Sequence, residues 1–280
     1  MWLVHLALVA AALYVAVIAG MYFAQTWLLF PTTLVQAGHV RLPASAQQLD
    51  VGVPGGDWLV GVHIPASSSR TGQRGPLLLG FGGNAWSADA TALYLHESVP
   101  DCDVVAFHYR GYRPSTGRPS AEALLADAVT IFDHVQQALA PERVVAVGFS
   151  IGSGVAAYLA RQRSLAGLIL VTSFDSLEAM ARDLYWWAPV GLLLRHRLPV
   201  IDFVRDRPTP TALIVAGRDT IVPARRSAPL RDAIPNLVLD RTIEAGHNDL
   251  YDRKAFGDVL REALAKINAG HPETRPGMAR

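Results

Sequence analysis

Apolar residues follow two patterns that divide the chain near Pro31. Residues Trp2 to Phe30 are almost continuously apolar, and no Asp, Glu, Lys or Arg occurs before Arg41. This stretch exceeds the roughly 20 apolar residues that a helix needs to cross a bilayer. After Pro31, short apolar runs are separated by Gly, Pro and polar residues. The pattern predicts a membrane-spanning helix over residues 1–30, followed by a folded domain over residues 31–270.

The same N-terminal segment partly fits a secretory signal. Val17 and Ala19 form a small-residue cleavage pattern before Gly20, but the positively charged leader of a signal peptide is missing. Tyr22 and Trp27 lie toward the other end, and aromatic rings favour the membrane interface. We therefore predict an uncleaved, single-pass N-terminal anchor. The alternative is a secreted or periplasmic protein released by cleavage, and the scarcity of nearby basic residues leaves the membrane orientation open.

Beyond Pro31, apolar runs alternate with segments of helical spacing. Runs that are apolar throughout, with helices between them, indicate a mostly parallel sheet with helices on both faces. The first two runs are joined through a Pro-Gly-Gly-Asp segment, which predicts an antiparallel hairpin at one edge. The predicted strands are Leu49–Val53, Trp58–Ile64, Pro76–Phe81, Asp103–Tyr109, Arg143–Val147, Gly167–Val171, Thr211–Val215 and Leu237–Ile243. The main predicted helices are Trp86–Glu97, Ser120–Leu139, Ile151–Arg163 and Ala255–Ile267.

One connection is longer than the others. The segment between Val171 and Thr211 holds about forty residues without a strand, which exceeds an ordinary connection in an α/β protein. We predict a helical cap at about residues 176–208, over the carboxyl edge of the sheet. Its large apolar side chains, with Trp187 and Leu192 as candidates, line a substrate pocket, dip toward the bilayer beside the N-terminal anchor, or serve as local core. The C-terminal residues 271–280 are predicted to be a disordered tail.

Charge and cysteine content narrow the choice of partners. The chain holds 25 Lys and Arg against 24 Asp and Glu, so no charge surplus points to nucleic acid. Cys102 is the only cysteine, which excludes an intramolecular disulfide and a cysteine-based metal site. We expect no metal and no organic cofactor, and the sequence leaves the oligomeric state open.

Ser150 is the candidate nucleophile. It lies in Gly148-Phe149-Ser150-Ile151-Gly152, which matches G-x-S-x-G between a predicted strand and a predicted helix. Such a turn strains the serine backbone, requires small neighbours and raises the hydroxyl above the sheet at a helix N-terminus. The alternative is a Gly-rich turn with an incidental serine, but the strand–turn–helix placement favours catalysis. Ser153, one helical turn further on, is expected to be a packing residue or a helix-capping residue.

His247 and Asp219 are the candidate base and acid. His247 follows the last predicted strand within Gly-His-Asn-Asp, and the other eight histidines are expected to be structural. Asp219 follows the preceding strand in Gly-Arg-Asp and would orient the imidazole and stabilise its charged form. Two alternatives stay open: Asp219 merely caps the next helix, or Asp175 is the acid.

A glycine-rich loop after the third strand is the candidate oxyanion site. The backbone N–H groups of Asn84, in Gly80–Ala85, and of Ile151 are the predicted donors. The loop also fits the G-x-G-x-x-A pattern of dinucleotide-binding proteins. That pattern requires an acidic residue near the end of the next strand, where this chain has His108-Tyr109-Arg110. The nucleotide interpretation is therefore rejected.

Taken together, these motifs resemble the membrane-anchored branch of the α/β-hydrolase-domain (ABHD-type) serine hydrolases. The resemblance runs from Leu28 to about Ile267. Besides the nucleophile, acid and histidine motifs, it rests on Leu29-Phe30-Pro31-Thr32, Gly83-Asn84-Ala85, Tyr109-Arg110-Gly111-Tyr112 and Gly117-Arg118-Pro119-Ser120. One position departs from the family pattern: Gly82 stands where members usually carry a loop histidine that is not part of the triad.

The resemblance implies the α/β-hydrolase fold and hydrolysis of an ester, thioester or amide, commonly with a lipid-like acyl group. Ser150 would attack the carbonyl, His247 would take its proton and Asp219 would hold His247, giving an acyl-enzyme that water cleaves. One alternative is an aminopeptidase or amidase with the same triad. Its acidic pocket would draw on Glu178, Asp183, Asp202 or Asp206. A non-catalytic binding protein on this fold is the other alternative.

Overall fold

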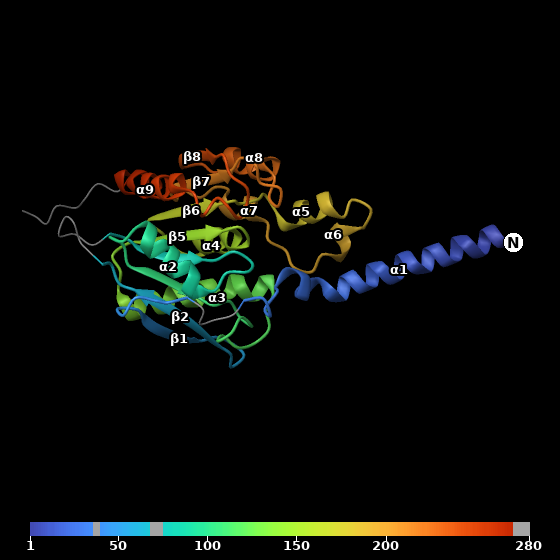
Figure 1. Cartoon of the computed structure of the whole chain (residues 1–280), viewed down its shortest axis with the longest axis horizontal. Helices are drawn as coiled ribbons and strands as arrows, with labels where there is room; N and C mark the ends of the chain where they lie inside the picture. The colour runs from blue at the N-terminus through green and yellow to red at the C-terminus, as the bar shows by residue number, and fades with distance from the viewer. Residues whose placement is uncertain (36–39, 68–74, 271–280) are drawn as a thin grey trace, which may run out of the picture.

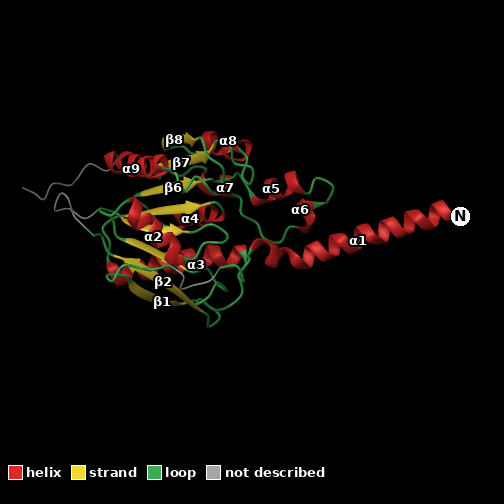
Figure 2. Cartoon of the chain, viewed as in Figure 1, coloured by secondary structure: helices red, strands yellow, loops and turns green. Residues whose placement is uncertain are grey.

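The centre of the molecule is an eight-stranded sheet in the order β1-β2-β4-β3-β5-β6-β7-β8 (Figure 2). This computed structural model describes residues 1–35, 40–67 and 75–270, so the predicted tail lies outside the described residues. β1 pairs antiparallel with β2, and β2 with β4, whereas all later pairings are parallel. The predicted sheet and its edge hairpin are confirmed. The strands are β1 (Gln47–Gly52), β2 (Trp58–Ile64), β3 (Leu77–Phe81), β4 (Val104–Phe107), β5 (Val144–Phe149), β6 (Gly167–Val171), β7 (Thr211–Ala216) and β8 (Leu237–Ile243).

Helices cover both faces of the sheet (Figure 1). α2 (Ala88–Ser98) and α9 (Lys254–Ala269) pack on one face. α3 (Ala121–Leu139), α4 (Ile151–Gln162), α7 (Val200–Val204) and α8 (Ala224–Ala233) pack on the other. The central strands therefore serve two cores at once: along β5, Val144 and Ala146 face one core, whereas Val145 and Val147 face the other. This double burial explains why the strands are apolar at every position and not at alternate ones.

Five predicted boundaries are wrong by two residues, among them the start of α2 and the end of β5. α2 begins at Ala88 and not at Trp86, because the Ser87 side chain accepts a hydrogen bond from the Ala90 amide and caps the helix there. β5 continues to Phe149 and not only to Val147, because Gly148 and Phe149 still pair with β3 and β6. The second extension carries the strand directly into the turn that holds Ser150.

The long connection between β6 and β7 is helical. It contains α5 (Leu177–Leu184), α6 (Val190–Leu193) and α7. α7 packs into the helical layer beside α4 and α8, whereas α5 and α6 stand at the end of the sheet from which α1 projects (Figure 1). The predicted helical cap is therefore present, and its outer part consists of α5 and α6.

α1 (Trp2–Leu29) projects far from the rest of the molecule (Figure 1). Among the described residues it is the one helix that is long and apolar enough to cross a membrane. Residues 1–17 are all exposed, but Ile18, Met21, Tyr22 and Gln25 are half-buried at helical spacing. Phe30, directly after the helix, is only 2% exposed within the core. The last turns of α1 thus pack on the folded body, while residues 1–17 stay exposed.

Candidate active site

Ser150 lies in a strained turn between β5 and α4. Its φ of 51° and ψ of −117° fall in a region that residues with side chains seldom adopt. Three hydrogen bonds hold this geometry: the Ser150 amide donates to Val171 O (2.9 Å), and Ser150 O accepts from Ser153 N (2.9 Å) and Ser153 Oγ (2.5 Å). Ser153 therefore stabilises the turn, and the strain is local to the candidate nucleophile.

The two glycines of the motif are required by close backbone contacts. A Cβ on Gly148 would collide with the backbone of Gly152 and Ser153. A Cβ on Gly152 would collide with the carbonyl oxygen of Phe81 and lie 2.5 Å from that of Gly82. The start of α4 can therefore pack against the end of β3 only because the residue at position 152 is a glycine.

Replacing Gly152 by alanine is expected to lower the free energy of unfolding by about 1–3 kcal/mol, the usual cost of overpacking a rigid site. Chemical denaturation of the full chain in detergent, followed by tryptophan fluorescence, measures this change. Gly257→Ala is the matched control, because its Cβ would come no closer than 3.6 Å to the flexible Arg261 side chain. Equal denaturation midpoints for the two variants would show that the contact at Gly152 is not limiting.

The structure joins His247 to Asp219. His247 Nδ1 lies 2.7 Å from Asp219 Oδ2, and the Asp219 side chain is only 1% exposed. The other carboxylate oxygen, Oδ1, accepts hydrogen bonds from the amides of Ile221 (2.9 Å) and Val222 (2.7 Å). This arrangement fixes the carboxylate and leaves His247 Nε2 available for proton transfer.

The three candidate residues share one edge of the sheet. Ser150, Asp219 and His247 follow β5, β7 and β8, which run parallel in the order β5-β6-β7-β8. No hydrogen bond between Ser150 Oγ and His247 occurs among the described residues. In unliganded sites such a bond is often long and shortens only when substrate is bound. The edge therefore carries a nucleophile and a preformed His–Asp pair.

Asp175, the alternative acid, is engaged elsewhere. Its carboxylate forms an ion pair with Arg226 (3.1 Å) and accepts a hydrogen bond from the Ser176 amide (2.7 Å). The carboxylate that contacts His247 is that of Asp219. The geometry therefore favours Asp219 as the orienting acid.

The glycine-rich loop lies beside Ser150. A Cβ added to Gly83 would come within 3.8 Å of Ser150 Cβ, so the loop is a direct neighbour of the candidate nucleophile. In the described part of the chain, neither the Asn84 amide nor the Ile151 amide donates a hydrogen bond. Ile151 begins α4, and the first amides of a helix have no acceptor within the helix. Both predicted oxyanion donors therefore lack a competing acceptor among the described residues.

Two tyrosines that the sequence analysis gave no role support this loop. Tyr109 Oη donates to Gly82 O (2.8 Å), and Tyr112 Oη donates to Asn84 O (3.1 Å). Arg110 between them forms a bidentate pair with the buried Asp127 (2.5 and 3.1 Å). The sequence signal was a Tyr-Arg-Gly-Tyr segment directly after a strand, since a buried tyrosine hydroxyl needs a hydrogen-bond partner. We infer that both tyrosines position the oxyanion loop.

The glycine at position 82 fits its surroundings. A Cβ there would lie 2.6 Å from Thr91 Oγ1 and 3.1 Å from Trp86 Cβ, so a larger side chain has little room. The Trp86 ring packs against Phe149 (5.2 Å between centroids) and Tyr251 (4.7 Å). Burial raises the pKa of Tyr251 to about 12, so this aromatic group is uncharged at neutral pH. Aromatic packing on Trp86 thus takes up the space beside the loop.

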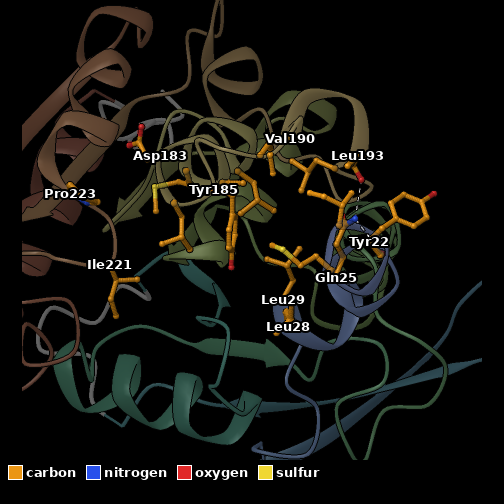
Figure 3. A pocket seen from close by; sticks show the side chains of 18 of the residues that line it. Tyr22, Gln25, Leu28, Leu29, Asp183, Tyr185, Val190, Leu193, Ile221 and Pro223 are labelled. Atoms are coloured by element: carbon orange, nitrogen blue, oxygen red, sulfur yellow. Dashed lines mark hydrogen bonds between the residues drawn. The ribbon is translucent and has the colours of Figure 1, made fainter. Parts of the chain in front are cut away.

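An apolar cavity of about 530 Å³ lies between α1, the cap and the segment that follows Asp219 (Figure 3). Its walls come from the last turns of α1, from α5 and α6, and from residues 220–225. Ser150 and His247 do not line it. Among the described residues no group of three or more His, Cys, Asp or Glu is placed to hold a metal ion.

Trp187 and Leu192 also lie outside this cavity. The Trp187 ring packs edge-on against Tyr14 of α1 (6.1 Å), and Tyr14 Oη donates to Trp187 O (3.1 Å). Leu192 is 87% exposed and borders a separate depression beside Trp186. A role of these two side chains in lining a substrate pocket stays a prediction.

Comparison with known proteins agrees with this geometry. Residues 77–199 match the family profile of the alpha/beta hydrolase fold. The uncharacterized protein Rv2307c of Mycobacterium tuberculosis is 34% identical over 216 residues, which cover 74% of this chain and 75% of that protein. Lysophosphatidylserine lipase ABHD12 of Danio rerio is 27% identical over 183 residues, covering 56% of this chain and 47% of that protein. The Pyrococcus furiosus esterase Pf2001 superposes with a TM-score of 0.66 at 15% identity, covering 84% of this chain and 97% of that one.

A sheet of this order, the turn at Ser150 and these relatives define a hydrolase of the α/β-hydrolase superfamily, to which the chain belongs. Within the superfamily, the ABHD-type protein ABHD12 is one of the relatives to which the chain is similar. The predicted fold class and the family resemblance are confirmed.

Proposed function

We propose that this protein hydrolyses acyl esters or thioesters, with a lipid-like acyl group, through a covalent acyl-enzyme. The observation that carries the proposal is the buried 2.7 Å His247–Asp219 pair on the same sheet edge as the strained Ser150 turn. A serine hydroxyl is a weak nucleophile on its own, and an oriented imidazole is the group that activates it. Asp219 supplies that orientation.

The reaction has two steps. Ser150 Oγ attacks the substrate carbonyl while His247 Nε2 takes the hydroxyl proton, and the Asn84 and Ile151 amides bind the resulting oxyanion. The C–O or C–S bond then breaks, and the leaving alcohol or thiol receives that proton from His247. In the second step His247 removes a proton from water, which attacks the acyl-enzyme and releases the acid. Ser150 regains its proton at the end.

A lipid-like substrate is supported by the relatives and by the apolar surface. ABHD12 is named a lysophosphatidylserine lipase. In this chain the apolar α1 adjoins a cap on which Trp186 and Leu192 are 82% and 87% exposed. Soluble proteins seldom expose neighbouring large apolar side chains without a partner. Contact with a bilayer would bring the enzyme to water-insoluble substrates.

We propose that α1 is an uncleaved anchor. Cleavage before Gly20 would remove Tyr14, which contacts Trp187, and Ile18, which lines the cavity beside the cap. Residues on the N-terminal side of that bond therefore make contacts with the folded body that a discarded signal would not need. These contacts favour retention of the whole helix.

Fewer observations support the alternative function, that of an aminopeptidase or amidase. An acidic pocket for an α-amine requires a free carboxylate, but three of the four candidate cap acids are paired with arginines. Glu178 pairs with Arg182 (2.7 Å) and Arg197 (2.9 Å), and Asp183 pairs with Arg225 (3.0 Å). Asp202 lies 3.7 Å from Arg205. A non-catalytic binding role has no observation in its favour, because a binder needs no His–Asp pair beside a strained serine.

A fluorophosphonate probe tests the proposal on the purified full chain in detergent. The probe is expected to modify Ser150, as read by mass spectrometry of the labelled peptide, and the chain is expected to cleave p-nitrophenyl esters. Aminoacyl anilides serve as the comparison substrates and are expected to react far more slowly. Labelling at a different serine, or faster cleavage of the anilides than of the esters, would contradict the proposal.

A further inference from the structure

We propose that the cavity between α1 and the cap receives the hydrocarbon tail of the substrate directly from the bilayer, so that the membrane anchor forms one wall of the substrate site. This inference rests on the proposed acyl hydrolase function. It adds a residue-level role for α1 beyond anchoring, and it gives the route by which an acyl chain reaches the sheet edge.

The walls of the cavity suit a hydrocarbon chain. α1 contributes Ile18, Met21 and Leu29, and the cap contributes Met180 and Leu193. Methionine side chains adapt their shape to a flexible ligand. The volume of about 530 Å³ lies within the roughly 300–1,000 Å³ that small-molecule sites occupy. In Figure 3, Leu29 of α1 and Leu193 of the cap lie among the side chains that surround the cavity.

One end of the cavity is formed by residues that follow the candidate acid in the chain. Thr220 and Ile221 line it, and they directly follow Asp219, whose carboxylate holds His247. The charged lining residues Asp183 and Arg225 pair with each other at 3.0 Å, so neither offers an unpaired charge to a tail. In Figure 3, Ile221 lies on the side of the cavity opposite Tyr22 and Leu193. A chain lying along the cavity would therefore run from α1 toward the acid loop.

The outer end lies at the depth of the membrane boundary. The part of α1 in which every residue is exposed, residues 2–17, spans about 24 Å at about 1.5 Å per residue. The hydrocarbon core of a bilayer is about 30 Å thick, so it would extend roughly four residues further. That distance reaches Ile18 and Met21, the α1 residues that line the cavity. The mouth of the cavity is therefore placed at the boundary between the hydrocarbon core and the headgroups.

Polar contacts hold α1 in this position against the cap. Gln25 Nε2 donates to Leu193 O and Gln25 Oε1 accepts from Arg195 N, both at 2.9 Å. Thr26 Oγ1 lies 2.8 Å from His196 Nε2, and burial lowers the pKa of His196, which keeps it uncharged at neutral pH. Such groups are costly in an apolar helix unless they have partners. These bonds fix the rotation of α1 and keep Ile18 and Met21 turned to the cavity.

Transfer from the bilayer avoids water. A tail that moves from lipid into an apolar cavity stays in an apolar environment, whereas a tail that crosses water exposes each methylene at a cost. The cap also exposes Leu184, Trp186 and Leu192, which lipid would cover. Long-chain substrates should therefore use the cavity, and short-chain substrates should not depend on it.

Met21→Trp, which fills the cavity from the α1 side, tests the inference. The full chain in phospholipid vesicles should lose about tenfold or more in kcat/KM for p-nitrophenyl laurate, because the tail loses its apolar contacts. Hydrolysis of p-nitrophenyl acetate should change by less than about twofold, since its acyl group does not reach the cavity. Phe23→Trp is the matched control: it lies on the same helix, is 77% exposed and should leave both rates unchanged.

Equal losses for acetate and laurate, or no loss for laurate, would overturn the inference. Cross-linking of a diazirine-labelled palmitate ester to the Ser150→Ala chain gives a second measurement, with adducts expected on peptides that contain Met21 and Met180. Because the cross-linking uses the Ser150→Ala chain, it can be measured even if the Met21→Trp chain fails to fold. Adducts at these sites without any effect of a folded Met21→Trp on laurate would indicate a resident lipid and overturn the role in catalysis. If the parent chain shows no ester hydrolysis that depends on Ser150, the proposed function itself is refuted.

Discussion

Replacing Ser150 by alanine is expected to lower the rate of ester hydrolysis by about 10⁶-fold, as loss of the nucleophile does in a well-studied serine protease. The substitution removes only Oγ. The backbone bonds that hold the turn, from Ser150 N to Val171 O and from Ser153 to Ser150 O, remain. The fold should therefore be unchanged while the acyl-enzyme cannot form.

The measurement is kcat on p-nitrophenyl butyrate together with fluorophosphonate labelling, and circular dichroism verifies the fold. Ser153→Ala is the matched control, because Ser153 is the neighbouring serine and its hydroxyl bonds to Ser150 O and to Ser173 Oγ (2.8 Å). This variant should still label, with a reduced rate if the turn loosens. If the Ser150→Ala chain is labelled at another serine and keeps full turnover, Ser150 is not the nucleophile.

The sequence was sufficient for the sheet and for the turn at Ser150. Central strands such as β5 are buried on both faces, so every position is apolar, and a strand of this kind is visible in a single sequence. Gly148 and Gly152 are equally visible, because their backbone contacts admit no side chain. These sequence patterns each have one local physical cause, and at these positions the prediction from the sequence agrees with the structure.

Contacts between distant segments could not be predicted in the same way. Gln25 reads as an isolated polar residue in an apolar helix, and its partners Leu193 and Arg195 lie about 170 residues further along the chain. The two tyrosines below the oxyanion loop were likewise visible as a motif, but the carbonyl groups they bind were not. Side-chain pairing across the fold depends on the relative placement of whole elements, and periodicity carries no information about it.

The cap shows the same limit. Its helical nature follows from length and composition, but the side chains that face the cavity do not. Tyr185 and Leu193 line the cavity, whereas Trp187 packs on Tyr14 and Leu192 points outward. Which of several adjacent apolar residues faces inward is decided by the position of α1, since α1 forms the opposite wall. An anchor helix that also builds part of the domain makes the two parts of the chain interdependent.

Replacing Asp219 by asparagine is expected to lower kcat by about 10⁴-fold, the loss measured for the equivalent change in one serine protease. The structure gives a reason for a large effect. Oδ1 of residue 219 accepts hydrogen bonds from the Ile221 and Val222 amides, so the asparagine oxygen should keep that position. The amide nitrogen would then face His247 Nδ1 and donate to it. This bond stabilises the tautomer with its proton on Nε2, which cannot accept the Ser150 proton.

Asp175→Asn is the matched control, because it makes the same chemical change at the alternative acid. Asp175 pairs with Arg226 at 3.1 Å, and both side chains are partly exposed, at 16% and 20%. Loss of a partly exposed ion pair costs little, so kcat should stay within about threefold of the parent chain. Steady-state kinetics of both variants on a short p-nitrophenyl ester give the ranking, with fluorophosphonate labelling rates as a second reading. A severe loss in Asp175→Asn with near-normal turnover in Asp219→Asn would transfer the role of the acid to Asp175, and the 2.7 Å pair at His247 would then be structural.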